Sequence, residues 1–300
     1  MKKISYLLLI SISLIWGSQF FLVDLVIHSI PPVTLAAVKA IIGAGTLALL
    51  YIFSGQGRKR EPVGRKQSKS LWGSFVWIGL LEAVIPFILI GWGQQTVSSS
   101  MAAILMGTIP IFTILFVKLF VPGETISASK WISVIVGMVG IVILFAPDLG
   151  SSFHAGNIAG DLALVGAAVS FAGSLILIKR LPPMSSILAM RNVLAAASVI
   201  LVPLAFLLED PLHVALTPTQ ILAVIILGSF HAGIVYMLYN LLIQRAGATF
   251  ASLNNYLVPL IGIVLGVTVL GDSLTWNAVA GLAVILLSLA LGGFEKQKRP

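Results

Sequence analysis

Two ionisable residues stand alone inside long apolar stretches, at positions that match when the chain is compared with itself. Glu82 follows Gly79 and His231 follows Gly228, and one shift of 149 residues relates both pairs. An ionisable group inside such a stretch is costly to bury unless a partner satisfies it. The matched positions therefore predict a Glu/His pair that flanks a central cavity and binds a polar substrate.

The same pair could also exchange a proton during the reaction cycle, because imidazole titrates near neutral pH. Glu82 and His231 each lie about ten residues into an apolar stretch, which in a helix is a depth of roughly 15 Å. Entered from opposite faces, both would reach the middle of a hydrocarbon core about 30 Å thick. The alternative is that each side chain only hydrogen-bonds the backbone of a neighbouring helix.

Apart from Lys118 and Lys130, which are assigned to cytoplasmic helix ends, Lys39 and Arg191 are the two basic residues within the apolar stretches. Each lies a few residues from an end. Long cationic side chains can extend from such positions to the lipid headgroups. Alternatively, they are vestibule charges that attract an anionic or carboxylate group or pair with Glu82. The sequence leaves both interpretations open.

Amides and aromatic groups supply further candidate substrate contacts. Asn254 and Asn255 precede Pro259, which cannot hydrogen-bond the carbonyl of Asn255 four residues back. These groups could bind substrate, or they could form an interhelical amide clamp worth about 1 kcal/mol. Three other polar or aromatic residues could line the same cavity: Trp16, Gln19 and Tyr239.

Composition narrows the chemistry. There is no cysteine, and no His-Glu-x-x-His or Walker-type phosphate loop occurs, so we expect no metal, no cofactor and no ATP-driven pumping by this chain. A membrane serine protease would need His231 beside Ser18, Ser174 or Ser229, but no Gly-x-Ser-Gly motif is present, and we do not expect an enzyme. The basic residues occur in short clusters without interleaved aromatics, which argues against nucleic acid as a partner.

The elements that position these residues are predicted to be transmembrane helices. The chain is 58% hydrophobic and 9% charged, far from the roughly 25% charged residues of soluble domains. A spanning helix needs about 20 mostly apolar residues. Ten segments meet or approach that length: 4–23, 34–53, 72–92, 102–121, 127–146, 159–178, 187–207, 221–243, 250–270 and 274–293.

Charge placement predicts the orientation of this all-α fold. The loops at 147–158 and 208–220 contain no Lys or Arg, whereas the run from Arg58 to Lys69 is strongly basic. Basic loops stay in the cytoplasm, so both termini are expected there. Residues 1–150 and 151–300 would each hold five helices, and an odd number makes the second half an inverted copy of the first. Transporters with such repeats bind substrate near the midplane, between the halves.

Short motifs in both halves resemble the drug/metabolite transporter superfamily, specifically its EamA-type members. They are Trp16-Gly17, the proline-led second span with Lys39, Ala102 to Pro110 and Gly123-Glu124, echoed by Phe171-Ala172, Arg191, Ala251 to Pro259 and Gly271-Asp272. Phe171 stands where tryptophan is common in that family, and Asp272 where glutamate is common. The resemblance implies transport of a small metabolite without naming it.

We therefore expect a multi-pass protein of the plasma (inner) membrane that moves small polar metabolites by alternating access. Amino acids or related compounds as substrates, and export as the direction, are implied by the resemblance only. Proton antiport and uncoupled facilitated diffusion both stay open, as does flipping of a lipid-linked substrate. The expected partners are the substrate, the bilayer and protons, with the chain as a monomer or weak homodimer.

Overall fold

The computed structural model describes residues 2–54, 65–97, 99–121, 126–144, 158–265 and 276–293, and these residues form helices joined by short turns. Two motifs of the resemblance, Gly123-Glu124 and Gly271-Asp272, lie outside the described residues. The same holds for most of the basic run that starts at Arg58.

The first half of the chain contains three long spans followed by shorter helices. The first span is α1 (Lys2–Gly17) and α2 (Gln19–Ile27), the second is α3 (Pro32–Phe53), and the third joins α4 (Arg65–Gly79), the π-helix η2 (Leu80–Val84) and α5 (Ile85–Gly93). After them come α6 (Ser99–Met106), α7 (Ile109–Phe120) and α8 (Ala128–Leu144).

The second half repeats this order of elements. It begins with α10 (Ile158–Lys179) and α11 (Ser186–Leu208), followed by the 3-10 turn η3 (Pro211–His213). Its third span joins α12 (Pro218–Ile226), the π-helix η4 (Leu227–Ile234) and α13 (Val235–Ala246). The last helices are α14 (Ala248–Ser252), α15 (Asn254–Leu265) and α16 (Trp276–Gly293). Both third spans therefore contain a π-helical segment.

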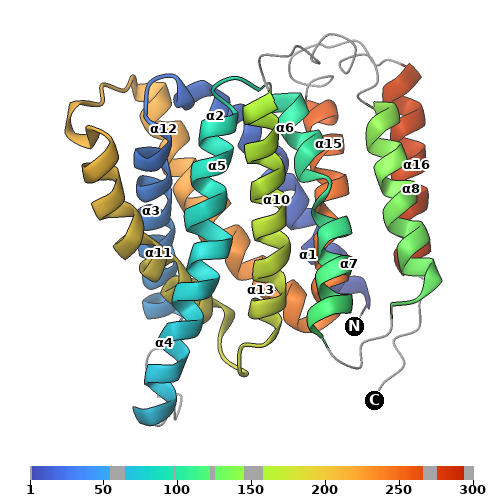
Figure 1. The fold of residues 1–300 in the computed structure, drawn as a ribbon, viewed down its shortest axis with the longest axis horizontal. Coiled ribbons are helices and arrows are strands. Elements are labelled where there is room, and N and C mark those ends of the chain that lie inside the picture. Colours follow the sequence, from blue (N-terminus) through green and yellow to red (C-terminus); the bar gives the residue numbers. More distant parts are fainter. Residues whose placement is uncertain are drawn as a thin grey trace.

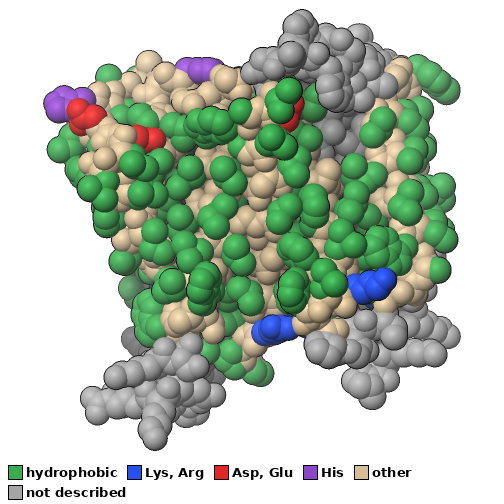
Figure 2. Space-filling view, in the orientation of Figure 1, with side chains coloured by type: hydrophobic (Ala, Val, Ile, Leu, Met, Phe, Trp, Pro, Cys, Tyr) green, Lys and Arg blue, Asp and Glu red, His purple; other side chains and the backbone are tan. Residues whose placement is uncertain are grey.

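Within the described ranges, six helices are long and apolar enough to cross a membrane, and they run side by side in one bundle (Figure 1). They comprise the first three spans of each half. The remaining predicted segments hold helices that are shorter or divided, so the total of ten spans stays a prediction. Large apolar side chains cover the outside of the bundle (Figure 2), as expected of a surface that faces lipid. The chain is therefore a multi-pass membrane protein.

Charged side chains gather at the two ends of the bundle. Lys118, Lys179 and Arg245 lie in the last turns of α7, α10 and α13, whereas Asp161 lies in the first turn of α10. On the face drawn in Figure 2, basic groups lie at the lower edge, and acidic groups and histidines lie near the upper edge. In Figure 1, α1 begins and α16 ends at that lower edge. This distribution agrees with the predicted orientation, for which the cytoplasmic side stays a prediction.

Candidate functional site

The segment around Glu82 is a π-helix whose backbone is supported by the second half of the chain. Pro86 has no N–H with which to bond the Glu82 carbonyl four residues back. The Tyr236 hydroxyl donates to that carbonyl at 2.9 Å, and the Ser170 hydroxyl donates to the neighbouring Leu81 carbonyl at 2.8 Å. Side chains of α13 and α10 thus supply donors at a helix irregularity, and π-segments of this kind are frequent at functional sites.

The Glu82 side chain is buried, with 1% of its surface exposed. The Ser174 hydroxyl on α10 donates a hydrogen bond to its Oε2 atom. Within the described part of the chain no cation forms an ion pair with this carboxyl group. A single hydroxyl is therefore the direct partner of an acid in the interior of the bundle.

His231 occupies the second π-helix, η4, and is also buried. Its Nδ1 lies 3.2 Å from the Ile226 carbonyl, and its Nε2 lies 3.0 Å from the Ser18 hydroxyl between α1 and α2. A carbonyl can only accept, so these partners place a proton on Nδ1. The indole N–H of Trp16 donates to the His231 carbonyl at 3.3 Å. The imidazole is thus held by the first span of the opposite half.

The two π-segments are supported in a reciprocal way. Glu82 of the first half is held by the first span of the second half, and His231 of the second half is held by the first span of the first half. Two glycines repeat the pattern: a Cβ on Gly79 would lie 2.9 Å from the Val193 carbonyl of α11, and one on Gly228 would lie 2.5 Å from Cβ of Ile42 on α3. Each third span therefore packs closely on the second span of the other half.

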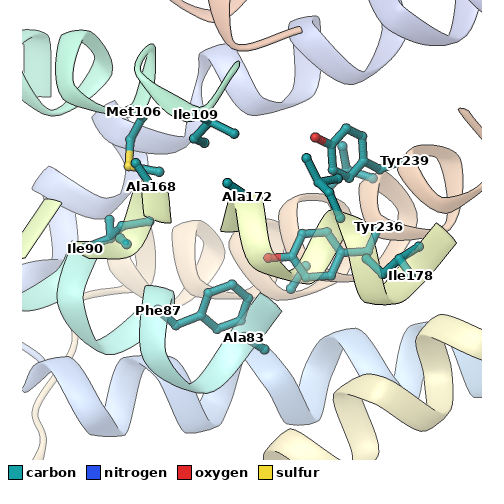
Figure 3. Close-up of a cluster of buried hydrophobic side chains, with 14 of the residues drawn as sticks. Ala83, Phe87, Ile90, Met106, Ile109, Ala168, Ala172, Ile178, Tyr236 and Tyr239 are labelled. Atoms are coloured by element: carbon teal, nitrogen blue, oxygen red, sulfur yellow. The ribbon is translucent and has the colours of Figure 1, made fainter. Parts of the chain in front are cut away.

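Aromatic rings connect the two segments. Trp16 packs edge-on against Tyr236 and Tyr239, with ring centroids 5.9 and 4.8 Å apart, and Phe87 lies 6.0 Å from Tyr236. Figure 3 shows Phe87 on α5 turned toward Tyr236 on α13. These rings, the two ionisable side chains, their serine partners and Lys39, described next, form what we call the central cluster. Its members are Trp16, Ser18, Lys39, Glu82, Phe87, Ser174, His231, Tyr236 and Tyr239.

Lys39 joins this cluster from α3, because its ammonium lies 4.1 Å from the centre of the Phe87 ring. The side chain is buried, with 2% of its surface exposed. A cation–π contact contributes about 2 kcal/mol at a desolvated site, which does not offset the several kcal/mol that burial of an ion costs. The burial of the side chain and its contact with Phe87 show that Lys39 extends into the bundle and does not reach the headgroups.

Arg191 has different surroundings. Its guanidinium donates two hydrogen bonds to the Asn192 side chain, at 3.1 and 2.8 Å, and lies 5.0 Å from the centre of the Tyr51 ring. The residue is only partly buried. The two predicted vestibule charges therefore lie in different surroundings. Lys39 is in the interior, and Arg191 is at a partly exposed position on α11.

The remaining candidates lie on α2 and α15. Gln19 begins α2 and is buried. Asn255 donates to the Ser252 carbonyl at 3.0 Å and to the Asn254 side-chain oxygen at 3.2 Å, and the Ser13 hydroxyl lies 3.4 Å from the Asn254 carbonyl. The contact with Ser13 places Asn254 against α1. Within the described residues the side-chain nitrogen of Asn254 has no hydrogen-bond partner.

Glu82 and His231 do not form an ion pair with each other. They are linked through Tyr236 and Trp16, a connection that the sequence interpretation did not anticipate. It missed Ser174 as the partner of Glu82 and Pro86 as a reason for the π-segment, and it placed Ser18 beside His231 only in the protease alternative. Pro86, four residues after Glu82, was a detectable signal, whereas the serines lie far away in sequence and only the fold brings them close.

The Ser18–His231 contact has the reach expected of a nucleophile and base. However, the imidazole is oriented by a backbone carbonyl where hydrolases of that type use a carboxylate or amide. The single hydroxyl hydrogen of Ser18 is also shared with the Ile15 carbonyl, 3.0 Å away. The geometry is better suited to holding the helices together than to acyl transfer.

Comparison with protein families identifies the chain. The model of the EamA-like transporter family matches residues 3–146 and again residues 158–293. The chain belongs to the EamA-like transporter family. This assignment agrees with the motifs around Trp16 and Lys39, and it points to a transporter and not to an enzyme.

Similar proteins cover nearly the whole chain of this EamA family member. The uncharacterized inner membrane transporter YedA of Escherichia coli (strain K12) is 26% identical over 295 residues, covering 97% of this chain and 92% of YedA. The uncharacterized transporter YoaV of Bacillus subtilis (strain 168) is 23% identical and covers 97% of both chains. A crystal structure with 20% identity superposes with a TM-score of 0.72 over 95% of this chain and 98% of that one, which shows a shared fold.

Proposed function

We propose that this EamA family protein is a secondary transporter of small polar metabolites, acting by alternating access around the central cluster. The observation that carries the proposal is the reciprocal support of Glu82 and His231 by serines of opposite halves. A buried polar group whose partner sits on the other half must break or exchange that contact if the halves move apart. A substrate bound there would replace the lost partners.

In this proposal, residues 1–150 and 151–300 are inverted five-helix repeats, and the cluster between them is the midplane site. Trp16, Tyr239, Gln19, Asn254 and Asn255 would add aromatic and amide contacts as the halves rearrange. Such architecture is characteristic of secondary transporters. The plasma (inner) membrane is the proposed location, in keeping with the name of the Escherichia coli relative. Export of amino acids or related compounds is the proposed direction and substrate range, from the family resemblance.

Transport in reconstituted vesicles tests this function. Proteoliposomes loaded with unlabelled amino acids should exchange them for external radiolabelled ones faster than protein-free liposomes do. Glu82→Gln protein, inserted in equal amount, is the matched control and should exchange more slowly because it lacks the buried carboxylate. Failure of the wild-type protein to exchange any member of a broad metabolite panel, combined with scrambling of a fluorescent lipid, would favour the flippase alternative.

A further inference from the structure

Lys39 is a buried basic residue with no counter-ion among the residues that the structure describes. It comes from α3, is 2% exposed and faces the Phe87 ring of α5. Across the described residues, neither an ion pair nor a hydrogen bond reaches its ammonium. The Phe87 ring is a weaker partner than an anion would be, because it offers only the partial negative charge of its face.

The ionisable groups near Lys39 form no ion pair with it in the described part of the chain. His231 on η4 is held by a carbonyl and a hydroxyl, and its ring is neutral or cationic. Glu82 on η2 directs a carboxylate oxygen to Ser174 and forms no ion pair with Lys39. From α11, the neighbouring helix of the other half, the charged residue in the span is Arg191, another cation. A bound anion would supply the direct counter-ion that Lys39 lacks among the described residues.

Aromatic surface lies directly beside this ammonium. Phe87, under Lys39, contacts Tyr236, and Tyr236 contacts Trp16, which also packs on Tyr239. A ligand that reaches Lys39 would therefore meet ring faces and edges around its apolar part. Arg191 contacts Asn192 and Tyr51, so among the described basic residues Lys39 is the one that lies against these rings and matches one negative charge on a ligand.

We propose that Lys39 binds the carboxylate of a small monocarboxylate whose apolar or aromatic part packs on Phe87, Tyr236 and Trp16. This inference rests on the proposed transport function and names the substrate class at the same site. A doubly charged phosphate is a poorer match, because recognition of phosphate uses several donors or a bidentate arginine. Lys39 thereby becomes a specificity-determining residue that discriminates substrates by charge.

A pair of probes that differ mainly in charge tests the proposal. Phenylacetate and phenylacetamide share a ring and a similar shape, and only the first carries a carboxylate. Equilibrium binding to the purified full-length protein in detergent should favour phenylacetate at least tenfold. Lys39→Met should lower phenylacetate affinity at least tenfold and leave phenylacetamide unchanged, whereas Lys39→Arg should retain most of the preference.

Arg191→Met is the matched control, because it removes a cation that already has partners and lies outside the cluster. It should bind phenylacetate as the wild type does. The proposal is overturned if wild-type protein binds both probes equally or binds neither, or if Lys39→Met binds phenylacetate normally. An equal loss in Arg191→Met would also overturn it by showing a general electrostatic effect.

Flux measurements separate this inference from the proposed function. Exchange of carboxylate metabolites that is insensitive to Lys39→Met would support transport and overturn carboxylate recognition by Lys39. Carboxylate-selective binding without flux of any metabolite would support recognition by Lys39 and contradict transport. The two proposals thus fail in different experiments.

Discussion

The π-segment around Glu82 and the π-segment around His231 occupy matched positions but are built differently. The first spans Leu80–Val84 and is followed by Pro86, whereas the second spans Leu227–Ile234 and has valine at the matching position 235. In the first half, Pro86 has no N–H to donate. Side-chain donors from α10 and α13 bond the carbonyls of Leu81 and Glu82 instead. The second half uses a longer π-segment in which the His231 ring bonds a carbonyl five residues back.

The difference shows that two matched positions can both bury an ionisable side chain while the backbone around them is supported in different ways. In both halves the ionisable side chain turns inward and meets a serine from the first span of the opposite half. The acid has one hydroxyl partner, and the imidazole has a hydroxyl and a carbonyl. The acid is thus the less well satisfied member, and we expect it to be the more responsive to substrate or protons.

Removal of the ionisable groups should have the largest effects. Under the proposed function, Glu82→Gln and His231→Ala should each reduce exchange in proteoliposomes at least tenfold, because each removes a group placed between the moving halves. Glu82→Gln should also flatten the dependence of exchange on external pH if the carboxyl group carries the proton. Reconstituted protein should be quantified to confirm insertion, and wild-type rates in both variants would remove the proposed pair.

Replacement of Gly79 or Gly228 by alanine should destabilise the packing between the two halves. Gly79→Ala places a methyl group 2.9 Å from a backbone carbonyl, and Gly228→Ala places one 2.5 Å from Cβ of Ile42, so neither neighbour can move freely. We expect a loss of about 1–3 kcal/mol for each, typical of overpacking. Thermal unfolding in detergent measures it. Gly45→Ala, where no atom lies within 4 Å, is the control and should show little change.

Tyr236 and Pro86 should be energetically coupled. Tyr236→Phe removes the donor to the Glu82 carbonyl and should cost about 1–3 kcal/mol, the range for a buried group left unsatisfied. Pro86→Ala restores an N–H four residues after that carbonyl, so Tyr236→Phe should cost less in this background. A double-mutant cycle on thermal stability gives the coupling, and strict additivity would contradict the proposed compensation.

The two serines provide the smallest and most discriminating comparison. Ser174→Ala removes the hydroxyl partner of Glu82, whereas Ser18→Ala leaves His231 its Ile226 carbonyl. Hydrogen bonds to charged groups contribute about 1.5–3 kcal/mol and neutral ones about 1 kcal/mol. We therefore expect Ser174→Ala to lower thermal stability more than Ser18→Ala does. A reversed order would mean that Glu82 is the better satisfied residue.

Much of the fold could be predicted from composition and periodicity, because a bilayer forces each spanning segment to satisfy its own backbone. Six long apolar helices, the family and the burial of Glu82 and His231 all agree with the pattern of the sequence. The internal match of Gly79 to Gly228 also identified the segments that carry the central cluster. These features depend on local composition and on a comparison of the chain with itself.

Only the tertiary structure decided which groups meet. Lys39 and Arg191 look alike in sequence, yet one lies in the interior on Phe87 and the other binds Asn192 at a partly exposed position. Ser174 reaches Glu82 across 92 residues of chain, and Ser18 reaches His231 across 213. The reason is physical: hydrophobicity fixes the depth of a residue in the bilayer, but only the packing of helices fixes the direction in which its side chain points and its partners.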